Sequence, residues 1–261
     1  MSRRIRIALI ILAVPLVLIG LLWGALLTLG NTRWGHEQIG SLVARLTGNN
    51  VRLYGIGGDL PDHLTLQKLE LADAQGIWLS AQNLDASWHP WEFLLERRIA
   101  VDTGHIQRLD WSRLPVSQSH SDRKASIPDI DVHEVSADTV KLSAALAGTA
   151  ATLNLHGSAH LRSLTDMQFT VAATRLDDEG TYSMQLAFDP RRMDAVFRLR
   201  EPAHGPLAGL LGVPGIGAVQ VAGDLAGLRQ AEHINLHADV GDLHAHATGQ
   251  VDLTHQTADL E

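Results

Sequence analysis

The sequence contains no cysteine, and only 5% of its 261 residues are aromatic. The absence of cysteine excludes a disulfide scaffold and a zinc site built on thiolates, and it leaves the redox environment open. Because rings are scarce, the apolar surfaces of the protein must be built from leucine, valine, alanine and glycine. The fold has to be stable without covalent staples.

Motifs for chemistry are also missing. There is no Gly-x-Ser-x-Gly elbow, no phosphate-binding Gly-x-x-x-x-Gly-Lys and no His-Glu-x-x-His. The glycine-rich stretches 55–58 and 212–217 lack the strand, spacing and helix of a nucleotide loop. Asp177 and Asp178 lie in an expected turn and are interpreted as turn formers. The sequence therefore nominates no catalytic residue, no cofactor and no enzymatic activity.

The charge of the chain is acidic. The formal net charge is −8, and the only charged residues among the first thirty are Arg3, Arg4 and Arg6. The remainder is thus more acidic still, which disfavours a nucleic-acid partner.

Histidine is abundant, with fourteen copies, and the pair His244 and His246 has the spacing of two ligands on one strand face. Strand periodicity, however, places the histidines opposite the aliphatic rows, where water would surround a bound ion. We therefore predict solvated histidines and no metal site. The histidines concerned are His156, His160, His237, His244 and His246.

One long apolar run is present, from Ile7 to Leu29. These 23 residues would form a helix of about 35 Å, against a hydrocarbon core of about 30 Å, and Pro15 does not outweigh their fifteen Leu, Ile and Val residues. A cleaved signal peptide would have a shorter core and a small-residue cleavage site. The run predicts an uncleaved anchor, and the preceding arginines place the bulk of the chain in the periplasm of a Gram-negative cell. The anchor comprises Ile7, Pro15, Trp23 and Leu29 with the residues between them.

After the anchor, Asn31 or Thr32 can cap a helix with apolar residues at helical spacing between Ile39 and Leu46. Gly48 would end this helix. Both an interfacial helix on the membrane and an ordinary core-packing helix fit the pattern.

From Leu64 onward the apolar period is two. Its parity slips near Gln67 and again at Asn83, which predicts bulges or kinks that keep one face apolar. On this reading Trp78 and Trp88 point to opposite sides of the sheet, one of them nearer solvent or the bilayer interface. Pro90 then begins a helical turn that reaches Arg98, and a strand resumes at Ile99.

Residues 115–130 lack periodicity and are interpreted as a loop or linker. The predicted organisation is an anchor with its cytoplasmic tip (1–30), a helix and first β segment (31–114), this linker, and a β segment (131–261). The last segment alternates through about seven strands joined by short turns, with a helical turn at 206–211. It stops within the alternating pattern at Glu261, which suggests the front part of a longer protein.

The predicted class is mainly β, antiparallel, with few helices. Amphipathic strands without covering helices require a barrel, a sandwich or a trough that holds something else, and periodicity does not choose between them. The residues assigned to the apolar lining for lipid or client are Leu64, Leu66, Leu79, Leu153, Leu155, Phe169, Val171, Met184, Leu186, Phe197, Val221, Leu236 and Val251.

The N-terminal region resembles a known family, the inner-membrane component of the translocation and assembly module (TamB-like), related to AsmA-type proteins. The resemblance covers residues 1–115 and is carried by the anchor and by a series of short motifs in order. The later strands are similar only in style, as in the stretch 205–212. The motifs are Asn31-Thr-Arg-Trp-Gly35, Leu46-Thr-Gly48, Gly55-Ile-Gly-Gly-Asp-Leu-Pro61, Leu69-Glu-Leu-Ala-Asp-Ala-Gln-Gly-Ile-Trp78, Leu84-Asp-Ala-Ser-Trp-His-Pro90, Leu94-Leu95, the strand from Ile99, and Arg113-Leu-Pro115.

This resemblance implies an elongated periplasmic sheet curled into a taco-like groove with an apolar interior, and it implies no catalytic residues. It also implies phospholipid transport between the membranes, or assembly of outer-membrane proteins and autotransporters with an outer-membrane barrel partner. The family's longer body and the C-terminal domain that meets this partner are not in the sequence. A membrane-anchored structural or adhesion module with a closed, dry β-sandwich remains an alternative, as does a hydrolase with a site built from distant histidines.

Overall fold

The computed structural model describes residues 33–116, 129–163, 165–203, 205–206, 217–228, 231–252 and 257–260. The chain is mainly β with few short helices, as predicted, and it divides into two compact units, Met1–His133 and Glu134–Glu261. The predicted anchor and almost all of the predicted linker lie outside the described residues. None of the helices in the described part is long and apolar enough to cross a bilayer.

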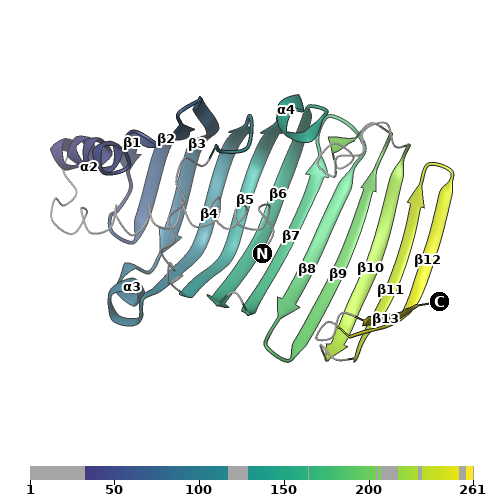
Figure 1. Cartoon of the computed structure of the whole chain (residues 1–261). Coiled ribbons are helices and arrows are strands. Elements are labelled where there is room, and N and C mark those ends of the chain that lie inside the picture. The colour runs from purple at the N-terminus through teal and green to yellow at the C-terminus, as the bar shows by residue number, and fades with distance from the viewer. Residues whose placement is uncertain are drawn as a thin grey trace. The chain divides into compact units, whose positions relative to one another are not determined.

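Unit 1 is an antiparallel meander with two short helices (Figure 1). Each strand pairs with the next one along the chain, so β1 is an edge strand. The elements are α2 (Arg33–Leu46), β1 (Val51–Gly57), β2 (His63–Asp73), β3 (Gly76–Trp88), α3 (Pro90–Glu96) and β4 (Arg98–Trp111). β5 (Asp129–Leu142) begins in unit 1 and ends in unit 2.

Helix α2 ends where the sequence predicts. Thr47 donates its backbone N–H to the Val43 carbonyl at 3.0 Å, and Gly48 and Asn49 follow with φ of 60° and 65°. A left-handed residue after the last turn is a common way to stop a helix, and glycine adopts it without a Cβ penalty. Val43 is fully buried, so one side of α2 packs into the core of unit 1.

Helix α3 is the turn predicted after Pro90, which occupies the first helical position and is almost completely buried. Proline suits this position because its missing N–H would have no partner in the helix. Arg97 closes the helix with a φ of 57° and donates its backbone N–H to the Phe93 carbonyl at 3.1 Å.

A crease crosses the four strands of unit 1. The regular pairing is interrupted on one row, where Gly55 of β1, Gln67 of β2, Asn83 of β3 and Gln107 of β4 stand opposite one another. Gly55 and Asn83 have φ of 61° and 49°, and the Asn83 amide donates to Gln107 Oε1. A residue in the left-handed conformation interrupts the alternation of a strand. The side chains after it then point to the opposite face from the one that the earlier alternation would give. Both predicted parity slips therefore lie on this one row.

The core of unit 1 combines residues from both sides of the crease. It also contains Trp78, which is 4% exposed, and Trp88 elsewhere in β3 is 5% exposed. The prediction that one of these tryptophans lies nearer solvent is wrong. Trp78 is the extra residue where the β2–β3 pairing shifts between Leu71–Leu79 and Ala72–Ile77, and a bulge redirects the side chain that it carries. The buried cluster is Val43, Val51, Leu53, Leu64, Leu66, Leu71 and Trp78.

Unit 2 is also an antiparallel meander in which every strand pairs with its neighbours in the chain. The seven strands predicted between Leu153 and Leu253 correspond to β6–β12. The elements are α4 (Ala144–Ala147), β6 (Ala151–Ser163), β7 (Asp166–Arg175), β8 (Thr181–Phe188), β9 (Arg192–Glu201), β10 (Val219–Leu228), β11 (Ala231–Val240), β12 (Leu243–Asp252) and β13 (Thr257–Leu260).

The sheet of unit 2 does not close. In its described residues the strand order runs from β6 to β13 without a pairing that returns to β6, and the main contacts are those between neighbouring strands. These strands form one layer, not the two packed sheets of the sandwich alternative. The helical turn predicted at 206–211 lies almost wholly outside the described residues.

Candidate functional site: the apolar face of unit 2

The strand registers of unit 2 align the apolar residues into rows on one face. Because directly paired residues share a face, the row through the middle of the sheet can be followed from β6 to β12. It contains no charged or hydrogen-bonding side chain. Its members are Gly157, Val171, Met184, Phe197, Gly223, Leu236 and Ala247.

The flanking rows have the same character. One begins at Ala159 and continues through Phe169 and Leu186 to Ile234, and the other begins at Leu155 and reaches Ala245. We call the three rows together the apolar face. Sequence reasoning assigned ten lining residues to this region, and the registers put all ten on the same side of the sheet. Leu155, Phe169, Val171, Met184, Leu186, Phe197, Val221 and Leu236 lie in the three rows, and Leu153 and Val251 lie in the rows beyond them.

The apolar face is half-buried. Leu153, on β6 in the row beside it, is 8% exposed, whereas Met184 in the middle row is 37% exposed. The other lining residues lie between these classes. Within the described residues, no helix is among the main contacts of β7–β12. An aliphatic surface of this extent remains available for contact with apolar matter.

Two positions of the middle row are glycines, which place no side chain above the sheet. A Cβ placed on Gly223 would stand 2.6 Å from Phe197 Cζ, so the aromatic ring lies directly over the glycine. Gly157 is similarly close to the backbone of β7, with the Val171 Cα 3.3 Å from the position of a Cβ. These close approaches let larger side chains fold flat against the sheet.

Polar residues border the apolar face at one end. The Tyr182 hydroxyl donates to Glu201 Oε2 at 2.9 Å, and Glu201 is 2% exposed. Burial, followed by this hydrogen bond, raises the pKa of Tyr182. Arg175 lies next to them and is paired with Asp177 at 3.1 Å and Asp178 at 3.3 Å. The Arg175 guanidinium is thus paired with two acids of the adjoining turn.

The opposite face of unit 2 is polar. The registers place His156, His160, His237, His244 and His246 there, as predicted. Asp239 links two of them, with His244 Nδ1 at 2.6 Å and His237 Nε2 at 2.9 Å. The hydrogen bond from His244 is the first cause that lowers the pKa of Asp239. Among the described residues no group of three His, Cys, Asp or Glu side chains has the geometry to hold a metal ion.

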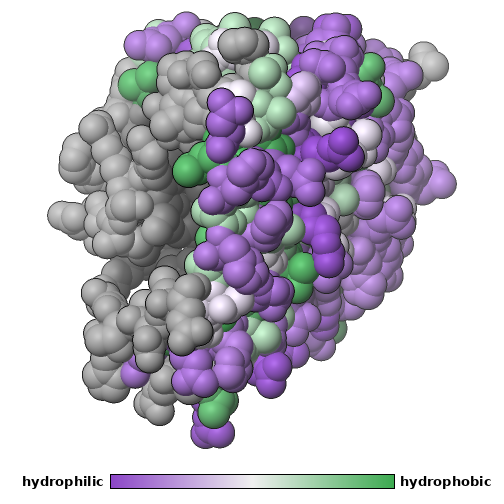
Figure 2. Space-filling view, turned by 90° about the vertical axis from the view of Figure 1, so that its right-hand side faces the viewer, coloured by the Kyte–Doolittle hydropathy of each residue, from purple (hydrophilic) through white to green (hydrophobic). Residues whose placement is uncertain are grey.

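Figure 2 shows this polarity from the side that is at the right of Figure 1. Hydrophilic residues cover most of the right-hand surface in that view, and hydrophobic residues are more frequent toward its middle. A sheet with one polar and one apolar face is consistent with the alternation of polar and apolar residues in the sequence.

The remaining predicted lining residues belong to unit 1. Leu64 and Leu66 are 7% and 4% exposed and lie in the buried cluster, and Leu79 packs against it. Their burial against Val43 and Trp78 gives them a role in the core of unit 1. The ten other predicted lining residues are described within unit 2 by itself.

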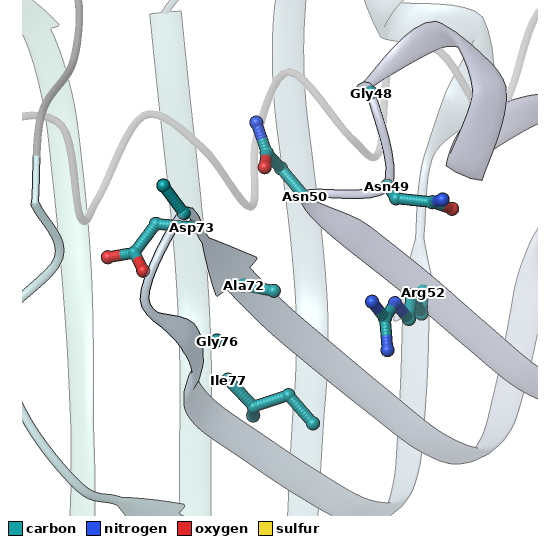
Figure 3. A pocket seen from close by; sticks show the side chains of 9 residues that line it. Gly48, Asn49, Asn50, Arg52, Ala72, Asp73, Gly76 and Ile77 are labelled. Carbon is teal, nitrogen blue, oxygen red and sulfur yellow. The ribbon is translucent and has the colours of Figure 1, made fainter.

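An open hollow of about 620 Å³ lies in unit 1 beside the end of α2 (Figure 3). Arg52 points into it from β1, and the Asp73 carboxylate points away from Arg52. Arg113 holds this carboxylate through two bonds of 2.6 and 2.5 Å. These bonds are the largest cause that lowers the pKa of Asp73. The hollow is lined by Gly48, Asn49, Asn50, Arg52, Ala72, Asp73, Ala74, Gly76 and Ile77.

Sequence reasoning missed the polar border and the hollow. Tyr182 and Glu201 are on different strands, and only their register brings the hydroxyl to the carboxylate. In the sequence, Glu201 alternates in phase with Leu199 and Phe197, which places it on the aliphatic face. This was the available signal, because a carboxylate on an aliphatic face needs a nearby hydrogen-bond donor.

Comparisons of the chain with protein-family models, with curated proteins and with solved structures found no match. The apolar face and its polar borders are therefore the features from which a function can be argued.

Proposed function

We propose that the protein is a non-enzymatic, inner-membrane-anchored periplasmic carrier whose apolar face forms a groove for hydrophobic cargo between the inner and outer membranes. The cargo is phospholipid or a hydrophobic outer-membrane protein client. The observation that carries the proposal is the set of three aligned rows on β6–β12, which contain one hydroxyl, that of Tyr182, and no charged side chain. Predicted membrane attachment through 7–29 supports the location.

The energetics favour such cargo. Each methylene removed from water contributes about 0.8 kcal/mol, so a single acyl chain lying on leucine, valine and phenylalanine side chains needs no strong polar contact. The unclosed sheet supports the proposal over a dry sandwich, because a sandwich would require a second layer on this face. Curling of the sheet into a taco-like groove, and transfer toward an outer-membrane barrel partner through a region beyond this sequence, belong to the same proposal.

The test places a carboxylate on the apolar face of the full chain. Leu186→Asp and Leu236→Asp are each purified gently from membranes, and mass spectrometry measures the retained phospholipid or protein client. The matched controls are Gln185→Asp and Asn235→Asp, which alter the neighbouring residues on the polar face. We expect the first pair to lose most retained cargo while the controls keep it.

Two results would refute the carrier function. One is wild-type protein that retains no apolar molecule, as expected of a dry structural module. The other is equal retention by the apolar-face variants and the polar-face controls. The identity of the retained molecule decides between lipid and protein cargo.

A further inference from the structure

Two short helices of unit 1 expose apolar side chains in the same pattern. On α2, Leu42 and Leu46 are 40% and 60% exposed, and on α3, Trp91 and Leu95 are 57% and 82% exposed. Each pair has a spacing of four, so each pair lies on one side of its helix. Exposed apolar side chains that gather on one side of a helix can belong to a surface for a membrane or a protein partner.

An exposed arginine accompanies each pair. Arg45 lies between the two leucines of α2, and Arg97 follows Leu95 at the end of α3. Neither arginine makes an ion pair within the described residues. Leucine, tryptophan and arginine together are the side chains that favour the boundary between lipid acyl chains and anionic headgroups.

Helix α3 is held in place by contacts on the side away from Trp91 and Leu95. Pro90 is buried, and the backbone N–H of His89 donates to the Ala100 carbonyl at 2.8 Å. Arg98 is bonded to Asp131 and lies 3.7 Å from Glu92. The exposure of Trp91 and Leu95 is therefore a property of an anchored helix and not of a frayed one.

The position of α2 in the sequence indicates which surface this helix can contact. The predicted membrane span ends at Leu29, and α2 begins at Arg33. The connection reaches at most about 14 Å at about 3.6 Å per residue, which keeps the start of α2 within or next to the headgroup layer. Figure 1 shows α2 beside edge strand β1 and α3 at the other end of the strands of unit 1, where α3 packs against β4.

We propose that α2 and α3 dock unit 1 onto the anionic surface of the bilayer, with Leu46 and Leu95 inserted below the headgroups. Arg45 and Arg97 contact lipid phosphates. Docking goes beyond cargo carriage. It rests on the membrane attachment included in the proposed function, but not on cargo binding by unit 2.

Because the chain has no native cysteine, a single introduced cysteine can be labelled specifically. The full chain carrying Leu95→Cys or Leu46→Cys is labelled with a polarity-sensitive fluorophore and reconstituted in nanodiscs of phosphatidylethanolamine and phosphatidylglycerol. A second set of nanodiscs contains a lipid with a doxyl quencher near the top of its acyl chain. The matched control is Leu228→Cys, a residue of unit 2 with 61% exposure.

We expect blue-shifted emission and several-fold stronger doxyl quenching at positions 46 and 95 than at position 228. Emission typical of water at position 95, or no quenching there, would overturn the docking. Blue-shifted emission without doxyl quenching would also overturn it, in favour of a protein partner or a second copy. Protein that does not co-migrate with the nanodiscs would overturn the docking and the membrane attachment together. Cargo retention on unit 2 is read separately, so either proposal can fail alone.

Discussion

Phe197 lies flat over Gly223 on the neighbouring strand, and the two residues are directly paired in the middle row of the apolar face. Gly223→Ala forces the ring to move, because the new Cβ would meet Phe197 Cζ at 2.6 Å. We expect a loss of about 1–2 kcal/mol in the free energy of unfolding, measured by urea denaturation. Ala226→Ser, on the polar face of the same strand, is the control and should change stability by less than about 0.5 kcal/mol. Equal effects of the two substitutions would contradict the packing described.

The crease of unit 1 predicts unequal costs for two glycines of β1. Gly55 has a φ of 61°, and a Cβ there would stand 2.7 Å from the Cβ of Gln67, whereas Gly57 faces only the Thr65 hydroxyl at 3.0 Å. Gly55→Ala should lower the free energy of unfolding by about 1–2 kcal/mol or more, and Gly57→Ala by clearly less. Thermal unfolding followed by circular dichroism compares them. A more stable Gly55→Ala protein would show that the crease does not require a left-handed residue.

Two tryptophans should differ sharply in their contribution to stability. Trp78 is buried in the cluster of unit 1 and Trp91 is exposed on α3. Trp78→Ala should cost about 3–5 kcal/mol, because it leaves a cavity between β2, β3 and α2. Trp91→Ala should cost less than about 0.5 kcal/mol and weaken membrane docking instead. Denaturant titration measures the first effect and quenching by doxyl lipid at position 95 the second.

The contact between Asp73 and Arg113 predicts a dependence of stability on pH. Because the folded state lowers the pKa of Asp73, its contribution is fully present above the unfolded value, near pH 4, and is lost as the pH falls through the folded pKa. Arg113→Met should therefore be less stable than wild type at neutral pH, and the difference should shrink in acid below about pH 4. Midpoints of thermal unfolding at several pH values test this.

The control for that experiment is Arg200→Met, which removes an exposed arginine of unit 2. Its effect should be small and should not follow the titration of Asp73. A gap between Arg113→Met and wild type that stays constant with pH would show that the ion pair does not carry the effect.

Alternation alone was sufficient to predict strands β6–β12 of unit 2. From Leu153 to Leu253 the apolar residues of the strands keep a period of two, and apart from the segment between β9 and β10 the turns are short, which favours pairing of each strand with the next. The lining residues of unit 2 could therefore be placed on one face without knowledge of any contact. In such a meander, the order of the strands in the sequence is also their order in the sheet.

Unit 1 was harder because its pairing is irregular. The parity slips at Gln67 and Asn83 were visible, but their alignment on one row with Gly55 and Gln107 depends on the registers of three strand pairs. The burial of both Trp78 and Trp88 was not predicted for the same reason. A residue inserted by a bulge breaks the alternation from which its direction would be read, and only its partner strand reveals the shift.

The pairing of each strand of unit 2 with only its predecessor and successor sets how this protein can change its length. A hairpin such as β7 and β8 could be duplicated or removed with the registers of all other strands intact, and each added pair would lengthen the greasy track by roughly 9–10 Å. Copying a unit of about twenty residues would thus change the length of such a sheet without altering its other strand pairs. The same locality allows the sheet to form strand by strand during synthesis, before the C-terminal strands are made.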